Sequence, residues 1–462
     1  MRRLVYMFVC LLNCVGFVKA QSIQERLNKA FQEFITDPQM RYAMAGISVM
    51  NSASGQILFE YNGNIGLAPA SCQKLVTSAT ALELLGINYR YKTELGYDGE
   101  IRDGKLSGNL YISGYGDPTL GSWRYIGTSD TAIISQWRKK IQDLRIKKID
   151  GQIIVNADQW ETAAVPGGWP WDDMGNYYGA GAYGLNWREN QYDLILKSGP
   201  NPGDKVMIAK MIPVLHNMIF TNELMAGKKG SGDNAYIYSA PYNDRAFIRG
   251  TIPPSQSAFT ISGSMTHPGM QLGYTLAAAL AEASGKQPGV REQSNKKKIE
   301  LLHVQYSPVL DSINYWFMRK SVNLYGEALV KTLAFEKNGK GVTEDGLAIM
   351  KDFWKSKGID PASLRMIDGS GLSPQNRVTT NSLVKVLQYA RSRPWFAQYM
   401  AAFPEYNKMK LKSGTIGGSK GFAGYHTSKE GITYTIALIV NNYDGSANEI
   451  VRKMFLVLDE LK

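Results

Sequence analysis

Residues 69–86 read PASCQKLVTSATALELLG, with a serine and a lysine three positions apart at the start of an apolar run. Positions three apart share a face of a helix, so Ser71 and Lys74 bring a hydroxyl and an amine together. The helix is apolar almost all round and ends at Gly86, which predicts a buried helix in the middle of a domain. A serine needs a neighbouring base to act as a nucleophile, and a lysine can serve once burial lowers its pKa.

Two later stretches carry polar groups that suit the same chemistry. The sequence SVN at 321–323 lies in the break between two predicted helices, where its hydroxyl and amide can point into a cleft. The sequence KSGT at 412–415 lies on a predicted strand, where Gly414 lets a substrate backbone come close. Each motif alone also has matches elsewhere in the chain, but the ordered set favours a serine acyl-transfer enzyme.

The predicted helices and strands indicate one domain that is built from both ends of the chain and interrupted by a long insertion. A helix at 22–35 and a hairpin at 45–61 stand early, while strands within 409–441 and a helix at 447–461 close the chain. The middle reads as short strands with many turns, closed by one helix at 271–283. We expect a signal peptide at 1–20, the catalytic domain at 21–92 and 295–462, inserted domain II at 93–158 and 259–294, and inserted domain III at 159–258.

The first residues are typical of export. Arg2 and Arg3 precede an apolar run at 4–18, and the small Ala20 stands at the expected cleavage point, which predicts a secretory signal peptide. A single-pass anchor is the competing interpretation, but the run is short and is broken by Asn13. No later stretch is long and apolar enough to span a bilayer.

Composition narrows the class of protein further. The formal net charge is +12, or +9 without the three basic residues of the leader, and the basic residues are scattered. An anionic wall or membrane surface therefore fits better than nucleic acid, with at most peripheral membrane contact. Cys10 and Cys14 leave with the leader, so Cys72 has no cysteine to pair with in the mature chain. The four histidines show no ligand spacing, and we expect no metal and no other cofactor.

The ordered motifs Ser-x-x-Lys, Ser-x-Asn and Lys-Ser-Gly resemble those of penicillin-binding proteins and serine β-lactamases. Ser321 follows Ser71 by 250 residues, a gap similar to that of class C low-molecular-mass penicillin-binding proteins, D-alanyl-D-alanine carboxypeptidases and endopeptidases with two inserted domains. GDPTL at 116–120, GWPWDD at 168–173 and DGSGLS at 368–373 are similar to that family too. The resemblance implies an α/β (α+β) fold: a β-lactamase/transpeptidase-like domain with an antiparallel sheet and a helical cluster, plus two inserted mainly-β domains.

The resemblance also implies a role for each motif residue. Ser71 would attack the carbonyl between two D-alanines while Lys74 takes its proton, and water would then hydrolyse the acyl-enzyme. Ser321 would relay a proton to the leaving amine, and Asn323 would hold the substrate amide and orient Lys74. The terminal carboxylate would be bound by Lys412, Ser413 and Thr415. The backbone N–H groups of Ser71 and Thr415 would form the oxyanion hole.

Two positions depart from the pattern of the family. A thiol is the stronger nucleophile, but Cys72 points roughly 100° away from the face of Lys74, so we interpret it as a packed thiol. Asn156 stands where the family often has an aspartate that contacts the amino group of the diamino acid side chain. Asp158 is the candidate substitute, so the recognition of that side chain stays open.

The leading hypothesis is thus a periplasmic serine carboxypeptidase or endopeptidase that acts on peptidoglycan stem peptides and cross-links and is inhibited covalently by β-lactams. A serine β-lactamase is a second hypothesis, although no glutamate motif of the class A type stands in the sequence. A catalytically idle wall-binding protein is a third, which the presence of Lys74, Asn323 and Lys412 disfavours. The sequence does not apportion carboxypeptidase against endopeptidase activity.

Overall fold

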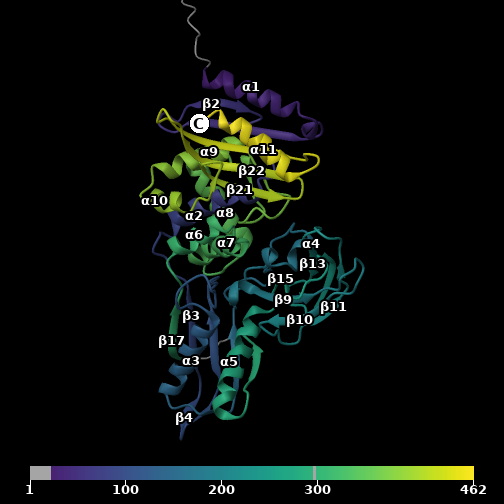
Figure 1. Ribbon diagram of the computed structural model, residues 1–462. Coiled ribbons are helices and arrows are strands. Elements are labelled where there is room, and N and C mark those ends of the chain that lie inside the picture. Colours follow the sequence, from purple (N-terminus) through teal and green to yellow (C-terminus); the bar gives the residue numbers. More distant parts are fainter. Residues whose placement is uncertain (1–21, 295–297) are drawn as a thin grey trace, which may run out of the picture.

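The fold is described from a computed structural model, which covers residues 22–294 and 298–462 (Figure 1). The predicted signal peptide at 1–20 lies outside the described residues. Within those two ranges, every helix is too short or too polar to cross a lipid bilayer.

A six-stranded antiparallel sheet joins the two ends of the chain. Its strand order is β2-β1-β23-β22-β21-β20, so the early hairpin pairs with the last strand. The predicted antiparallel sheet is therefore confirmed. Its strands, in chain order, are β1 Met44–Asn51, β2 Ile57–Tyr61, β20 Glu405–Tyr406, β21 Met409–Ile416, β22 Ser419–Thr427 and β23 Thr433–Asn441.

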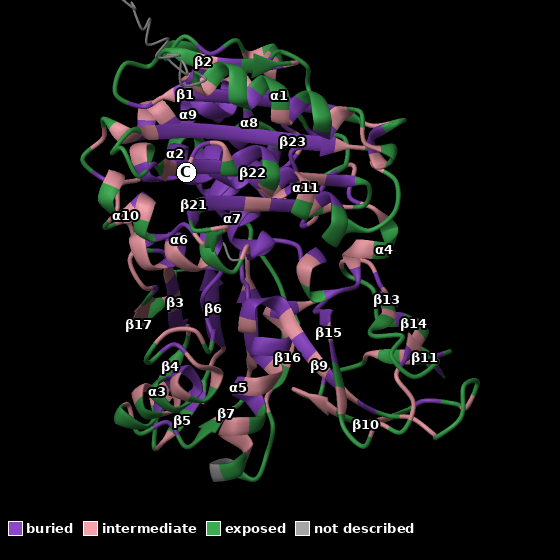
Figure 2. Ribbon diagram, turned by 45° about the horizontal axis from the view of Figure 1, so that its top comes forward, coloured by how far each residue is buried: buried purple, intermediate pink, exposed green. Residues whose placement is uncertain are grey.

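Helices cover both faces of this sheet. On one face lie α1 Ile23–Ile35 and α11 Ala447–Asp459; the other carries α2 Lys74–Leu84, α6 Leu310–Arg319, α7 Asn323–Asn338, α8 Thr343–Ser356, α9 Thr380–Arg391 and α10 Phe396–Ala401. Strand β23 supplies both cores, because Ile436 and Leu438 join the first and Ala437 and Ile439 join the second. Figure 2 shows β23 buried along almost its whole length, as expected for a strand covered on both faces.

The middle of the chain forms the lower part of Figure 1. One five-stranded sheet has the order β16-β8-β6-β3-β17, and further sheets contain β10-β9-β15 and β11-β14-β12 with β13. A single apolar core runs through both groups. The main elements are β3 Lys92–Tyr97, β6 Leu110–Gly114, α3 Asp130–Asp143, β8 Gln152–Asn156, α4 Trp171–Met174, β9 Gln191–Lys197, β10 Met207–Ile212, β11 Ile219–Asn222, β12 Met225–Ala226, β13 Asn234–Tyr238, β14 Arg245–Ile252, β15 Phe259–Ser264, α5 Pro268–Ser284, β16 Gly289–Glu292 and β17 Glu300–Tyr306.

Two features of the middle differ from the sequence prediction. Helix α3 was not predicted, although its buried Ile133, Trp137 and Ile141 recur at helical spacing. Strand β17 pairs with β3, so this stretch belongs to the five-stranded sheet and not to the catalytic domain that we expected to resume at 295. The remaining domain boundaries stay a prediction, and we propose that the chain returns to the catalytic domain after Tyr306.

Candidate active site

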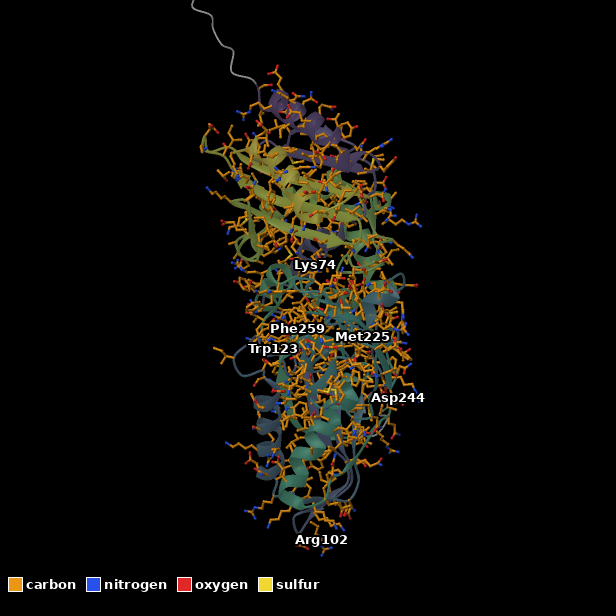
Figure 3. All side chains as sticks on the ribbon, turned by 45° about the vertical axis from the view of Figure 1, so that its right-hand side comes forward. Lys74, Arg102, Trp123, Met225, Asp244 and Phe259 are labelled. Carbon is orange, nitrogen blue, oxygen red and sulfur yellow. The ribbon has the colours of Figure 1, made fainter. Side chains whose placement is uncertain are left out.

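Lys74, labelled in Figure 3, lies between the six-stranded sheet and the inserted part, and Ser71 Oγ is 2.9 Å from its amine. A 3₁₀ turn at Ala70–Gln73 leads directly into α2, whose first residue is Lys74, so the predicted helix is confirmed with a tighter first turn. Two strands fix the approach to this turn. Ala68 donates its N–H to Asn441 Oδ1 at 2.8 Å, and its carbonyl accepts a hydrogen bond from Ser419 Oγ at 2.7 Å.

The Lys74 amine is fully buried and has three oxygen neighbours: Ser71 Oγ at 2.9 Å, Asn323 Oδ1 at 2.6 Å and the Ser370 carbonyl at 2.6 Å. The two carbonyl oxygens can only accept, so they take two N–H groups of the amine. A neutral amine then keeps one lone pair for the hydroxyl of Ser71. Burial lowers the Lys74 pKa well below its usual value and the charge of Lys412 adds to this, while Asp368 and Glu327 act in the opposite direction.

The Ser370 carbonyl is held in place by a buried turn at 368–373. Glu327 of α7 accepts the N–H groups of Gly369 and Ser370, each at 2.9 Å. Burial raises the pKa of Glu327, with a further contribution from the nearby Asp368. Asp368 in turn accepts from the Trp169 indole at 2.9 Å, which ties the turn to the inserted part. The turn therefore positions the Ser370 carbonyl that accepts a hydrogen bond from Lys74.

Ser321 and Asn323 lie in the break between α6 and α7, as predicted from the sequence. Ser321 has φ 58°, a left-handed conformation that is uncommon outside glycine. Its hydroxyl lies 3.0 Å from Lys412 Nζ. Asn323, the first residue of α7, presents its oxygen to Lys74, and its Nδ2 donates to the carbonyl of Tyr178 at 2.8 Å. The break thus brings a hydroxyl and an amide beside the serine and the lysine.

Strand β21 brings Lys412 and Thr415 of the KSGT sequence to the cluster, whereas the Ser413 hydroxyl donates to the Tyr406 hydroxyl at 3.0 Å and is not among the lining residues of the cavity. Lys412 is buried, which lowers its pKa to about 8, and its Nζ donates to the Ser413 carbonyl at 2.9 Å. Thr415 is exposed at the edge of the cavity. A Cβ on Gly414 would lie 2.5 Å from the carbonyl of Pro69. Glycine is therefore required here by the close approach of the protein's own chain, and not only by a substrate as the sequence suggested.

A cavity of about 630 Å³ opens above Ser71. It combines residues of the catalytic domain with residues of the inserted part, and its lining includes Ser71, Ser321, Asn323, Thr415, Arg124, Asp173, Tyr178 and Tyr236. Lys74 and Lys412 lie buried beneath it. Arg124 was not singled out from the sequence, and Asp173 was noted only as part of the GWPWDD stretch at 168–173, with no role of its own.

A model of a known protein family matches nearly all of this chain. The model of the D-Ala-D-Ala carboxypeptidase 3 (S13) family matches residues 27–460. The chain belongs to this family. The resemblance inferred from the three motifs is thereby confirmed.

Individual S13 relatives and solved structures agree with this assignment. A D-alanyl-D-alanine carboxypeptidase of Actinomadura sp. (strain R39) is 25% identical over 91% of this chain and 82% of its own length. A crystal structure of penicillin binding protein 4 from Haemophilus influenzae has a TM-score of 0.80 at 21% identity and covers 94% of this chain and 99% of that chain. A second structure of the same protein, complexed with a novel β-lactam, has a TM-score of 0.74 at 21% identity and the same coverage. These matches confirm the predicted fold class.

The S13 structure places the candidate residues for diamino acid recognition away from the nucleophile. Asn156 and Asp158 line a separate cavity of about 360 Å³, whose lining does not include Ser71. The carboxylate that lines the Ser71 cavity is that of Asp173, half-buried beside Tyr178. Desolvation raises the Asp173 pKa, while a hydrogen bond from Tyr178 opposes the shift.

Cys72 of this S13 protein is packed inside the domain. Its Sγ donates to the Lys412 carbonyl at 3.4 Å, and a Cβ on Gly421 would lie 3.1 Å from the sulfur. Burial raises the pKa of the thiol to about 11, against the opposing charges of Lys412, Lys420 and Lys74. The buried, protonated thiol is the arrangement expected of a structural cysteine.

We therefore expect the native S13 protein to resist alkylation at Cys72. With a pKa of about 11, roughly one thiol in a thousand is ionised at pH 8, and the sulfur is covered as well. Iodoacetamide at pH 8 should leave the folded protein unmodified by mass spectrometry and modify the urea-unfolded protein fully. Fast modification of the folded protein would show that Cys72 is accessible and reactive.

Proposed function

We propose that this S13 protein is a serine-type carboxypeptidase that removes the terminal D-alanine from peptidoglycan stem peptides through an acyl-enzyme on Ser71. The single observation that carries the proposal is the environment of Lys74. Its buried amine has two N–H groups engaged by carbonyl oxygens and lies 2.9 Å from Ser71 Oγ. An uncharged amine in that position is a general base for the hydroxyl.

The acylation step uses these atoms in turn. Ser71 Oγ attacks the carbonyl carbon between the two D-alanines, and its proton passes to Lys74 Nζ. The backbone N–H groups of Ser71 and Thr415 stabilise the tetrahedral oxyanion, a contribution of about 3 kcal/mol per donor in comparable enzymes. The C–N bond then breaks, and the leaving amine receives a proton through Ser321, whose hydroxyl lies between the cavity and Lys412.

The acyl-enzyme is released by water. The amine of Lys74 accepts a proton from the attacking water, the ester bond to Ser71 breaks, and the serine regains its proton. Asn323 holds the substrate amide in both steps, because its side chain lines the cavity while its oxygen orients Lys74. The terminal carboxylate is bound by the hydroxyls of Ser413 and Thr415 above the charge of Lys412.

The volume of the cavity, about 630 Å³, supports endopeptidase action on cross-links as a second activity of the same site. Its lining extends from β21 to Tyr178 and Tyr236 of the inserted part, which leaves room for a branched peptide. The apolar leader and the peptidoglycan substrate together support export to the periplasm. A serine β-lactamase uses the same first step, and the lifetime of the penicillin adduct separates the two functions.

We expect a fluorescent penicillin to label the purified mature protein at Ser71. Ser71→Ala should abolish the label, because the ring-opening step forms an ester with that hydroxyl. Cys72→Ala is the matched control and should retain the label, since the thiol lies beneath the site. Gel fluorescence with peptide mapping measures both variants. Label that survives on Ser71→Ala would remove the mechanism, and rapid loss of the label from the wild type would favour a β-lactamase.

The pH dependence of kcat/KM should show two limbs. Lys412 is positively charged below its pKa of about 8, so binding of a substrate carboxylate should weaken as the pH rises through about 8. On the acid side, activity should fall as Lys74 becomes protonated and ceases to be a base. Hydrolysis of a D-alanyl-D-alanine peptide and of its methyl ester, measured from pH 5 to 10, separates the effects. An alkaline limb of equal size for the ester would contradict the role of Lys412.

A further inference from the structure

Arg124 faces the catalytic cavity from the inserted part. Arg124 lies in the loop that follows GDPTL at 116–120, and its side chain is 18% exposed and lines the same cavity as Ser71. Its Nε donates to both carboxylate oxygens of Glu189, at 2.8 and 3.0 Å. Among residues 22–294 and 298–462, no acceptor takes a hydrogen bond from its two terminal nitrogens. One edge of the guanidinium is therefore fixed and the other is presented to the cavity.

Glu189, which holds Arg124 in place, lies in a strained turn. Glu189 is fully buried, and Arg188, Glu189 and Asn190 all have positive φ values of 53 to 54°. Successive non-glycine residues in this conformation carry a conformational cost and persist only where surrounding contacts hold them. Such strain is often found at functional sites, and here it places a carboxylate directly behind Arg124.

Further hydrogen bonds hold the Oε1 atom of Glu189 in place. Its Oε1 also accepts from Ser122 Oγ at 2.6 Å and from the Tyr325 hydroxyl at 2.7 Å. Tyr325 lies on α7 two residues after Asn323, and Trp316 of α6 lies 5.5 Å from the guanidinium. The position of Arg124 is thus set relative to the helices that carry the catalytic amide. Trp123, labelled below Lys74 in Figure 3, borders the same guanidinium at 5.5 Å.

We propose that Arg124 is a specificity-determining residue that binds a carboxylate on the acyl-donor part of the substrate, at a site separate from that for the terminal carboxylate. The inference rests on the proposed function. The free edge of a guanidinium offers two parallel N–H groups that match a carboxylate, and partial burial strengthens the pairing. In the proposed function Lys412 and Ser413 serve the leaving-group side, whereas Arg124 comes from the inserted part and lines the cavity together with Asn323 and Tyr178.

The other charged residues of the cavity are compatible with this role of Arg124. Asp173 and Lys320 also line it, and Lys320 is exposed to solvent. Within the described residues, Glu189 is the one acid that forms an ion pair with Arg124. Glu189 balances the charge of Arg124, but the terminal N–H groups of the guanidinium still need acceptors when a substrate fills the cavity, and a carboxylate supplies two of them.

The test compares two acylated peptides, X-D-Ala-D-Ala with X as glutamate or glutamine, which differ in one charge and little in shape. The wild type should hydrolyse the glutamate peptide with a kcat/KM at least about tenfold higher than the glutamine peptide. Arg124→Gln should reduce this ratio by about tenfold. The ratio is independent of the fraction of folded enzyme, so partial unfolding does not imitate the effect.

Two further variants serve as controls. Arg319→Gln removes an arginine of α6 that bonds to the Phe403 carbonyl outside the cavity, and it should leave the ratio within about twofold. If Arg124→Gln does not fold, Arg124→Lys decides, because it keeps the charge but loses the two-pronged contact and should reduce the ratio about threefold or more. An unchanged ratio in both Arg124 variants would overturn the inference.

The failure of this inference is distinguishable from that of the proposed function. A wild type that is labelled by penicillin at Ser71 and hydrolyses both peptides equally overturns the role of Arg124 alone. A wild type that is neither labelled nor active on either peptide overturns both.

Discussion

The structure depends on a buried amine that has neutral oxygens as its nearest partners. Lys74 Nζ contacts a hydroxyl, an amide oxygen and a backbone carbonyl, with no carboxylate among its hydrogen-bond partners. Burying a charge in such surroundings costs several kcal/mol, so the neutral form is favoured. The acids Asp368 and Glu327 lie near enough to oppose this shift. The desolvation of Lys74 is larger than their effect, so its pKa stays well below the usual value.

The rest of the fold holds several chain segments in place around the Lys74 amine. Strands β22 and β23 fix Ala68, and β21 packs so closely on the 3₁₀ turn that only glycine fits at position 414. Helix α7 contributes Asn323, and the buried turn contributes the Ser370 carbonyl. The inserted part supports the turn through Trp169 and closes one side of the cavity. The inserted part, attached between α2 and α6, therefore both supports the turn and lines the cavity.

Much of this arrangement could be predicted from the sequence. Ser71, Lys74, Ser321, Asn323 and Lys412 stand in motifs whose order and local structure are legible, and their convergence is confirmed by the coordinates. The Ser370 carbonyl could not be found in this way, because a backbone atom has no residue signature. Arg124 and Glu189 were missed for a related reason: tertiary packing brings this pair to the site, and no local spacing marks them. Asp173 belongs to the GWPWDD stretch, but its place in the cavity could not be read from the sequence. Helix α3 did have a readable pattern, which was obscured by the strands around it.

The most direct test of the central claim is the titration of Lys74 itself. Lysine labelled with ¹³C at Cε and ¹⁵N at Nζ reports its charge by NMR, and comparison with Lys74→Arg assigns the signal. A Lys74 signal that titrates well below the usual value of about 10.4, and that is uncharged where acylation is fast, is the predicted result. A signal that titrates near that usual value, with the enzyme fully active while Lys74 is charged, would contradict the account.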